Sequence, residues 1–302
     1  MTDLVIAYVN GQDKVWQKQV DTFIQQNRIF ENRYGTRFND IGLFPYQLRL
    51  VSKFMPFIRK IHLLVSNIEQ IYGLDLPLNT NVVLHKDFIP SKFLPTFNSC
   101  TIEMFLWNIP DLAEQFIYAN DDMLPIKELK ESDFFSPSGK IKINFKIDEI
   151  NKCNNQFRQV CYSQYQMIKE TTINDNYSHQ FSKEHYYRPY HSFTPMIKSH
   201  CEQTYLKFQN EIDKQISPFR TNKNHNQYIY PLYELLCLKN TLESKIPFIY
   251  TEIKVDNNEV VKALKENAYK IICINDNRMS MLRTIDTKPI FDELERRLQW
   301  NL

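Results

Sequence analysis

The sequence predicts an α/β fold with a mostly parallel, Rossmann-like sheet and a helical insertion or second lobe. In the first 150 residues, β-rich runs alternate with segments of helical spacing. The β-rich runs are almost continuously apolar, as expected of strands covered by helices on both faces. Residues 151 to about 250 are instead rich in Asn, Gln, Tyr, His and Lys and carry helical patterns.

The N-terminal elements follow from short-range signals. A β-rich run at 3–11 ends in Asn10-Gly11, and residues 14–26 have helical spacing. Residues 45–55 predict a second helix, because Pro45 suits its first turn. Further strands are predicted at 58–67, 81–87 and 114–122. Residues 98–112 predict a helix capped by Asn98 or Ser99 that ends near Pro110.

The later elements are predicted as helices at 157–170 and 229–240 and a strand at 268–277, which we expect to rejoin the sheet. Residues 288–300 form an amphipathic pattern whose apolar face is Ile290, Phe291, Leu294 and Leu298. We expect this helix to pack on its own domain, with a membrane surface or a partner as the alternative. The expected units are a core at 1–150, a mainly helical insertion at 151–250, and a returning strand and helix at 251–302.

Composition narrows the class of protein. The net charge is only +2 and the basic residues are spread along the chain, which argues against a nucleic-acid binder. No apolar run reaches the roughly 18 residues of a membrane span, and the N-terminus lacks the pattern of a signal peptide. The six cysteines form no C-x-x-C pair, which favours reduced thiols over disulfides or a zinc site. We therefore expect a cytoplasmic protein.

Glycine usage excludes two common phosphate-binding loops. The five glycines all lie at or before Gly139, and neither G-x-G-x-x-G nor G-K-[ST] occurs. A dinucleotide fingerprint or a Walker-type loop is therefore not expected. If the protein handles phosphates, it must do so with side chains and a metal ion.

Polar side chains follow three of the predicted strands where each strand ends. They are Asn10, Asn67 and the triplet Asn120-Asp121-Asp122. Ligands of open α/β sheets bind beyond the carboxyl ends of the strands, where these segments converge. Magnesium prefers one or two carboxylates together with substrate phosphates, so the triplet predicts a metal site that clamps a diphosphate. The alternative is an ordinary strand-end turn, in which Asn and Asp are also favoured.

Single residues of interest lie in polar loops. Arg37 and Asp40 occur in "GTRFND", His191 in "RPYHSFTP" and Arg220 in "SPFRTN". The guanidinium group suits phosphate because it bonds two oxygens at once, although a surface ion pair is an equal alternative. A structural, hydrogen-bonded role is the alternative for His191.

Several blocks together resemble the Stealth family of bacterial capsular polysaccharide phosphotransferases, which is similar to the N-acetylglucosamine-1-phosphotransferase of animals. The first 140 residues carry most of the resemblance, and scattered matches continue to residue 277. The matching positions are Asn10, Gly11 and Asp13; Arg37, Phe38, Asp40, Leu48, Arg49, Pro56, Ile58 and Arg59; Asn98, Ser99, Glu103, Ile109, Pro110, Asn120, Asp121 and Asp122; and His191, Phe219, Arg220, Asn275 and Asp276.

The resemblance implies a GT-A-like nucleotide-sugar fold and transfer of a sugar-1-phosphate. A hydroxyl of an acceptor saccharide would attack the sugar-proximal phosphorus of a nucleotide-sugar, typically a UDP-hexose or UDP-N-acetylhexosamine, and release UMP. A phosphodiester for capsule or exopolysaccharide would form. A lipid-linked acceptor and peripheral attachment to the inner face of the plasma membrane are compatible with this role.

The resemblance also implies roles for single residues. Asp121, Asp122, Asn120 and Asp276 would hold Mg²⁺ or Mn²⁺. Arg37 and Arg220 would hold the transferring phosphoryl group, and Asp40 or His191 would take the acceptor's proton. The expected nucleotide-sugar contacts are Asn10, Gly11, Asp13, Arg49, Asn67, Asn98 and Glu103.

Two other functions stay open at this point. A metal-dependent glycosyltransferase would use similar carboxylates but release UDP, because fold alone does not fix chemistry. A protein that binds a nucleotide-sugar or saccharide without turnover is the second. Its support is that Ile41, Gly42 and Leu43 stand where the family usually has an acid after the position of Asp40. Cys100 likewise replaces a frequent His.

Overall fold

The computed structural model of the chain describes residues 1–28, 38, 41–153, 155–172, 182–254, 256–275 and 286–299. Its centre is a five-stranded sheet in the order β3 (Thr80–Leu84), β2 (Ile58–Val65), β1 (Thr2–Ala7), β4 (Gln115–Asn120) and β9 (Thr194–Ile197). The first four strands are parallel, and β9 is antiparallel to β4. The predicted α/β class with a mostly parallel sheet is confirmed.

Strand β1 lies in the middle of this sheet because it can be buried on both faces. Leu4, Val5 and Ile6 are consecutive and fully buried, so the side chains of both faces of the strand avoid water. The register pairs Ala7 with Leu64 of β2 and with Asn120 of β4. The carboxyl ends of three parallel strands therefore meet at one edge.

A second sheet of three strands has the order β11 (Phe248–Glu252), β12 (Ile271–Asn275) and β5 (Met123–Pro125). Strand β12 runs parallel to β11 and antiparallel to β5. The predicted strand at 268–277 is thus present, but the expectation that it rejoins the main sheet was wrong. The edge of β4 is already paired with β9, whereas β5 offers a free edge directly after β4 ends.

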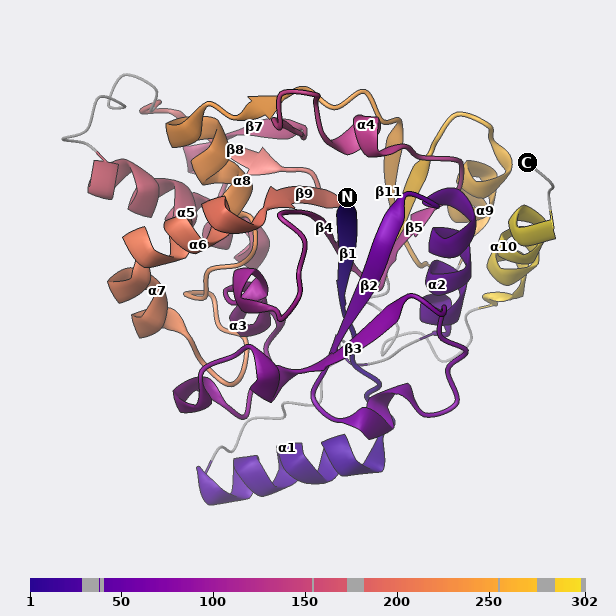
Figure 1. Cartoon of the computed structure of the whole chain (residues 1–302), viewed down its shortest axis with the longest axis horizontal. Helices are drawn as coiled ribbons and strands as arrows, with labels where there is room; N and C mark the ends of the chain where they lie inside the picture. Colours follow the sequence, from indigo (N-terminus) through magenta and orange to yellow (C-terminus); the bar gives the residue numbers. More distant parts are fainter. Residues whose placement is uncertain are drawn as a thin grey trace.

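Helices cover both sides of the strands (Figure 1). Helices α1 (Lys14–Gln26) and α2 (Leu43–Phe54) occur where they were predicted. Helix α3 (Ser99–Glu103) is much shorter than the predicted 98–112, and a separate 3₁₀ turn follows at Leu106–Asn108. The carbonyl group of Met104 accepts hydrogen bonds from the indole of Trp107 and the hydroxyl of Tyr230. These side chains take the place of a helical partner at that carbonyl.

Residues 151–250 are mainly helical, as predicted, but they also supply strands to other parts of the fold. Their helices are α5 (Gln156–Thr172), α6 (Lys198–Lys207), α7 (Gln209–Gln215) and α8 (Ile229–Tyr233), with a π turn at Glu234–Leu238. These helices lie to the left of the central strands in Figure 1. Strand β9 belongs to the central sheet and β11 to the second. The division of the chain at residues 150 and 250 stays a prediction.

The remaining elements are short or peripheral. They are α4 (Glu131–Phe134), β6 (Ile141–Lys142), β7 (Phe145–Glu149), β8 (His185–Pro189), β10 (Thr241–Leu242), α9 (Asn258–Lys265) and 3₁₀ turns at Ile68–Ile71, His85–Asp87, Ser91–Phe93 and Ile150–Lys152. Strands β7 and β8 pair antiparallel, and β6 pairs with β10.

The C-terminal helix α10 (Lys288–Gln299) packs on its own chain, as predicted. Ile290 and Leu294 are fully buried, and the helix lies beside α2 and α9 (Figure 1). Its apolar face is therefore satisfied without a membrane or a partner. Among the helices of the described residues, none combines the length and apolar character needed to cross a bilayer.

A buried ion cluster joins β1 to β2. The Asp3 side chain is fully buried, and its carboxylate accepts hydrogen bonds from Arg59 at 2.8 and 2.6 Å and from the Ala113 N–H at 2.8 Å. His62 Nε2 lies 3.0 Å from the same carboxylate. Burial by itself raises the pKa of Asp3, but the bonds from Arg59, His62 and Ala113 hold that pKa well below its usual range.

We predict that Asp3→Asn lowers the free energy of unfolding at pH 7 by about 3 kcal/mol, since Arg59 loses its buried counter-charge and the Ala113 N–H loses an ionised acceptor. Because the folded-state pKa of Asp3 is lowered, this stability is fully present above the unfolded pKa of about 4 and is lost as pH falls below it. Urea unfolding at pH 7, 5, 4 and 3 measures the effect.

The matched control is Asp111→Asn. Asp111 also faces Arg59 and Lys60, but its side chain is 59% exposed, and Asn tolerates its positive φ of 58°. The control should leave the free energy of unfolding close to that of wild type, because an exposed ion pair contributes little. A difference between wild type and Asp3→Asn that stays constant from pH 7 to pH 3 would contradict the assignment.

Candidate active site at the crossover between the two sheets

The acidic turn, Asp121 and Asp122, is the place where the chain leaves one sheet and enters the other. Strand β4 ends at Asn120 and β5 begins at Met123. The fully buried Gln47 of α2 donates from Nε2 to the carbonyl oxygens of Asn120, at 2.6 Å, and Met123, at 2.7 Å. One amide group therefore holds the backbone on both sides of the turn.

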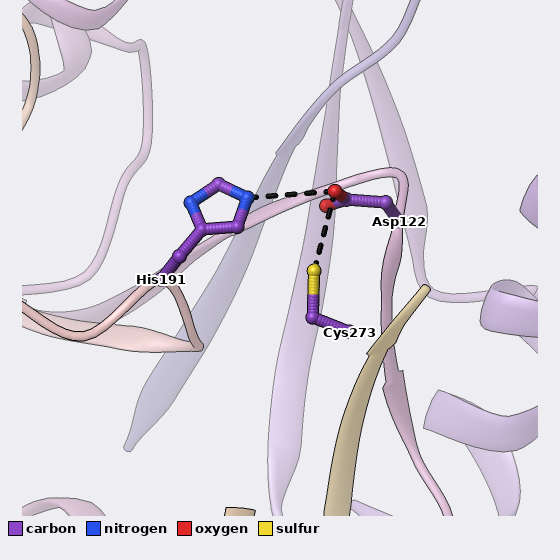
Figure 2. A group of neighbouring side chains, drawn as sticks. All are labelled: Asp122, His191 and Cys273. Carbon is purple, nitrogen blue, oxygen red and sulfur yellow. Dashed lines mark hydrogen bonds and ion pairs between the residues drawn. The ribbon is translucent and has the colours of Figure 1, made fainter. Parts of the chain in front are cut away.

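Asp122 is the centre of a cluster built from three distant parts of the chain (Figure 2). Its Oδ2 atom lies 3.4 Å from Nε2 of His191, which is in the loop between β8 and β9. The same oxygen accepts from the Cys273 thiol, in the middle of β12, at 3.3 Å and from the Asn275 amide, at the end of that strand, at 3.1 Å. A main-chain hydrogen bond joins the same two segments, because the Ile274 N–H donates to the Asp122 carbonyl at 2.9 Å.

The two carboxylate oxygens of Asp122 differ in their surroundings. Burial raises the pKa of Asp122, but the nearby His191 and the hydrogen bonds from His191, Cys273 and Asn275 outweigh burial and lower that pKa. The carboxylate is therefore ionised at neutral pH. Its Oδ1 atom is buried and has no hydrogen-bond partner among the described residues. An ionised, buried oxygen without a donor is a natural ligand for a cation.

His191 connects this cluster to the helical region. Its Nδ1 atom lies 2.9 Å from the hydroxyl of Tyr228, just before α8, while Nε2 faces Asp122. The rings of Phe157 and Tyr250 pack edge-on against the imidazole. Both nitrogens are therefore engaged, and the ring is held in one orientation.

A second acidic group lies close by. The Glu103 carboxylate, at the end of α3, accepts from the Gln227 N–H at 3.0 Å and from the Tyr118 hydroxyl at 3.3 Å. Burial raises the pKa of Glu103, and the charge of the exposed Arg220 partly offsets this. The pKa of Tyr118 is raised first by burial and then by Glu103 and by Asp121. Glu103, Arg220 and Asp121 therefore share one electrostatic environment.

The ends of β1 and β2 form a separate hydrogen-bonded group. Asp13 caps α1 by accepting from the N–H groups of Val15 and Trp16, each at 3.0 Å. Its Oδ2 also accepts from Asn67 at 3.2 Å and Gln70 at 2.7 Å. Burial raises the pKa of Asp13, but these bonds, led by Gln70, lower it. The carboxylate is thus used to join the two strand ends.

Asn10 and Gly11 lie in the same group. The side chain of Gln70 binds the backbone of Asn10. Its Oε1 atom accepts from the Asn10 N–H at 2.6 Å, and its Nε2 atom donates to the Asn10 carbonyl at 3.2 Å. A Cβ atom at Gly11 would overlap the carbonyl oxygen of Phe38. Glycine at this position therefore allows two backbone segments to touch.

Two further predicted contact residues have structural partners. Arg49 forms a bidentate ion pair with Glu295 of α10, at 2.8 and 3.2 Å, so the structure does not bring it into the Asp122 cluster. Asn98 caps α3 and donates to the Ser217 carbonyl at 3.0 Å, which fixes the segment that carries Arg220. Arg37, Asp40 and Asp276 lie outside the described residues.

Some residues of the cluster were not predicted from sequence. Cys273 lies inside an apolar strand and resembles any other core residue, and Tyr228 lies in a polar stretch without a recognisable motif. Gln70 and Gln47 carried no signal either. Asn275 was visible as the polar end of a strand, which is the signal that also identified Asn10 and Asn67.

These observations define an α/β protein with a candidate metal centre at the carboxyl edge of a mostly parallel sheet. Oxygen, nitrogen and sulfur atoms of Asp122, His191 and Cys273 lie within 4.8 Å of one another and could hold an ion. Residues 37–143 match the family description "Stealth protein CR2, conserved region 2". This match confirms the resemblance drawn from the sequence.

Curated relatives extend the similarity beyond this region. The chain is 29% identical to the capsular polysaccharide phosphotransferase fcs1 of Haemophilus influenzae, over 92% of this chain and 79% of that protein. It is 26% identical to the exopolysaccharide phosphotransferase cps2G of Lactiplantibacillus plantarum, over 98% and 91%. It is 28% identical to the capsular polysaccharide phosphotransferase WcwK of Streptococcus pneumoniae, over 97% and 92%.

Solved structures give more distant matches. Mouse xyloside xylosyltransferase 1 in its apo form matches with a TM-score of 0.42 and 13% identity, over 92% of this chain and 99% of that chain. The galactosyltransferase LgtC in complex with donor and acceptor sugar analogues matches with a TM-score of 0.42 and 12% identity, over 100% and 98%.

We predict that Gln47→Leu lowers the free energy of unfolding by ~2–4 kcal/mol, because two buried carbonyl groups lose their donor. Urea unfolding followed by circular dichroism measures this change. Ser52→Ala is the control, since Ser52 is exposed on the same helix and bonds only the Leu48 carbonyl. Equal stability of the two variants would show that the acidic turn does not depend on Gln47.

Proposed function

We propose that the protein transfers a sugar-1-phosphate from a nucleotide-sugar to a saccharide hydroxyl during synthesis of a capsule or exopolysaccharide. The oxygen of the acceptor hydroxyl forms a bond to the sugar-proximal phosphorus, and the bond from that phosphorus to the bridging oxygen breaks. UMP leaves from a UDP-hexose or UDP-N-acetylhexosamine, and the hydroxyl proton passes to a base on the protein. The bond between the sugar's anomeric carbon and its oxygen stays intact.

The observation that carries the proposal is the buried, ionised carboxylate of Asp122 at the carboxyl edge of the sheet. The names of the relatives, capsular and exopolysaccharide phosphotransferases, support the reaction class. Phosphoryl transfer asks a protein mainly to position its substrates and to neutralise charge on phosphate oxygens. The carboxylates of Asp121 and Asp122, through a bound cation, and the guanidinium of Arg220 are groups that can perform these two tasks.

The donor atoms of the site fit a divalent cation. Oδ1 of Asp122 is a buried acceptor without a hydrogen-bond partner among the described residues. The adjoining residue, Asp121, provides a second carboxylate. Oxygen ligands suit Mg²⁺ or Mn²⁺, whereas the thiol of Cys273 and the imidazole of His191 suit softer ions. We therefore assign the carboxylates, with Asn120 and Asp276, as ligands, and Cys273 and Asn275 as groups that orient Asp122. Such an ion, when bound, supplies charge neutralisation for the diphosphate.

Arg220 is the described cation best placed to hold the transferring phosphoryl group. It is exposed and donates to the Ser99 hydroxyl, and its charge lies near Glu103. Its fork of N–H groups can bind two phosphate oxygens together. Arg37 is proposed for the same role, and the group around Asn10, Gly11 and Asn67 for the nucleotide.

His191 is the proposed base. The distance of 3.4 Å between Nε2 and Asp122 Oδ2 is longer than an ordinary N–H···O bond of roughly 2.9 Å, whereas Nδ1 lies 2.9 Å from the Tyr228 hydroxyl. In the reacting complex the neutral ring would carry its proton on Nδ1, as donor to Tyr228. Nε2 would then exchange its contact with Asp122 for one with the attacking hydroxyl and accept the hydroxyl proton. Asp40 is the alternative base.

The proposed function is tested by identifying the nucleotide that leaves. The protein is incubated with MgCl₂, neutral oligosaccharide acceptors and each of several UDP-sugars, and the nucleotides are separated by chromatography. We expect UMP, a phosphodiester signal in the ³¹P spectrum, and loss of turnover after EDTA treatment. We expect Asp122→Asn to lower kcat by roughly 10²–10³, because charge at the transferring diphosphate is no longer neutralised.

Each other result has a distinct meaning. Release of UDP with a phosphorus-free product would identify a glycosyltransferase. No nucleotide release from a broad donor panel, together with measurable donor binding, would favour a protein without turnover. Asp133→Asn is the matched control, since Asp133 in α4 is partly buried and pairs with Lys270 rather than with a residue of the Asp122 cluster, and it should leave kcat unchanged.

We predict that His191→Gln lowers kcat by about 10²–10⁴, because the attacking hydroxyl loses its base while the donor still binds. Steady-state kinetics at saturating donor measure the change, and His185→Gln on β8 is the control with a similar substitution away from Asp122. A His191→Gln variant within about threefold of wild type in kcat would point to Asp40 as the base, because a positioned base contributes far more than that.

A further inference from the structure

A groove separate from the Asp122 cluster lies in the helical region. It has a volume of about 610 Å³ and is bounded by one face of α5, by α7 and by His225. From α5 it receives Tyr162, Gln166 and Glu170, and from α7 it receives Glu211. None of the reactions proposed above uses these side chains.

The chemistry of this groove disfavours phosphate. Glu170 and Glu211 contribute carboxylates, and the described lining residues include neither Lys nor Arg. A phosphate or nucleotide placed there would meet like charge without compensation. A neutral polyhydroxyl compound would meet carboxylate, amide and hydroxyl groups that bond to hydroxyls, and the ring of Tyr162 offers an amphipathic surface.

His225 is the most informative residue of the groove. It is only 3% exposed, and neither ring nitrogen has a hydrogen-bond partner among the described residues. Gln215 also lines the groove, and its buried Oε1 atom likewise has no hydrogen-bond partner among the described residues. Buried polar atoms without partners cost free energy, so a ligand that supplies a donor and an acceptor would be stabilised here.

The protonation state of His225 decides which ligands fit. Burial lowers the pKa of His225 to about 4, so the ring is neutral at pH 7. A neutral imidazole presents one N–H donor and one acceptor nitrogen. A sugar hydroxyl, which both donates and accepts, complements it better than an anion does.

The chain segment that follows His225 joins the helical region to the Asp122 cluster by hydrogen bonds. Gln164 of α5 donates to the carbonyl and the side-chain oxygen of Asn226, at 2.7 and 2.9 Å. Within the next two residues, the Gln227 N–H binds Glu103 and the Tyr228 hydroxyl binds His191. One hydrogen-bonded segment, residues 225–228, therefore connects His225 to the proposed base.

We propose that this groove binds a neutral stretch of the acceptor saccharide, away from the hydroxyl that reacts. The inference rests on the proposed function for the identity of the acceptor, but binding itself is independent of turnover. It assigns the helical region a role in recognising a chain of sugars rather than a single one. Rigid contacts along such a chain hold the reacting hydroxyl in place.

The test is saturation-transfer NMR on the full chain without donor, with maltotetraose and N,N′-diacetylchitobiose as neutral probes and sialyllactose as the anionic probe. Ser163→Trp fills the groove from α5, where Ser163 is part of the lining. Gln159→Trp is the control, an exposed position on the same helix outside the lining. Circular dichroism establishes that both variants are folded.

We expect at least one neutral probe to bind wild type and the control, about tenfold weaker binding to Ser163→Trp, and no binding of sialyllactose, since the lining is acidic. Absence of neutral binding, equal binding by Ser163→Trp, or preference for sialyllactose would overturn the proposal. Saccharide binding in the groove without UMP release would leave the groove standing and remove the proposed function. UMP release without saccharide binding would do the reverse.

Discussion

The arrangement of the whole site depends on the burial of one carboxylate. An ionised group removed from water must be given compensating partners, and Asp122 receives them from the β8–β9 loop and from the end of β12. These segments are 69 and 151 residues away in the chain. The need to satisfy Asp122 therefore fixes how the second sheet and the helical region sit against the central sheet.

The same constraint separates the roles of two adjacent acids. Asp122 is buried and oriented, while Asp121 faces the environment of Tyr118 and Glu103. Two neighbouring carboxylates at the end of a strand thus face different surroundings. The one of Asp122 is held by His191, Cys273 and Asn275, and the one of Asp121 acts on Tyr118. Both carboxylates could help to hold a cation, and such an ion would supply the charge neutralisation that phosphoryl transfer requires.

The sequence was informative where signals are local and silent where pairing is distant. Helix α1 could be predicted because residues 14–26 have helical spacing, and the strand ends could be predicted because polar residues interrupt apolar runs. Strand β5 has only three residues, too few for a periodic signal, so the second sheet was missed. Arg49 was expected to contact the nucleotide-sugar, and its ion pair could not be foreseen because its partner Glu295 lies 246 residues away. Cys273 was missed because a buried cysteine looks like any core residue.

The position of β1 has a consequence for the conserved region itself. Residues 37–143 include β2, β3 and β4, but the strand that separates β2 from β4 comes from the first seven residues of the chain. An excised copy of the region would present two unpaired, apolar strand edges to solvent, which invites aggregation. The boundaries of the matched region, residues 37 and 143, therefore do not coincide with those of a unit that folds on its own.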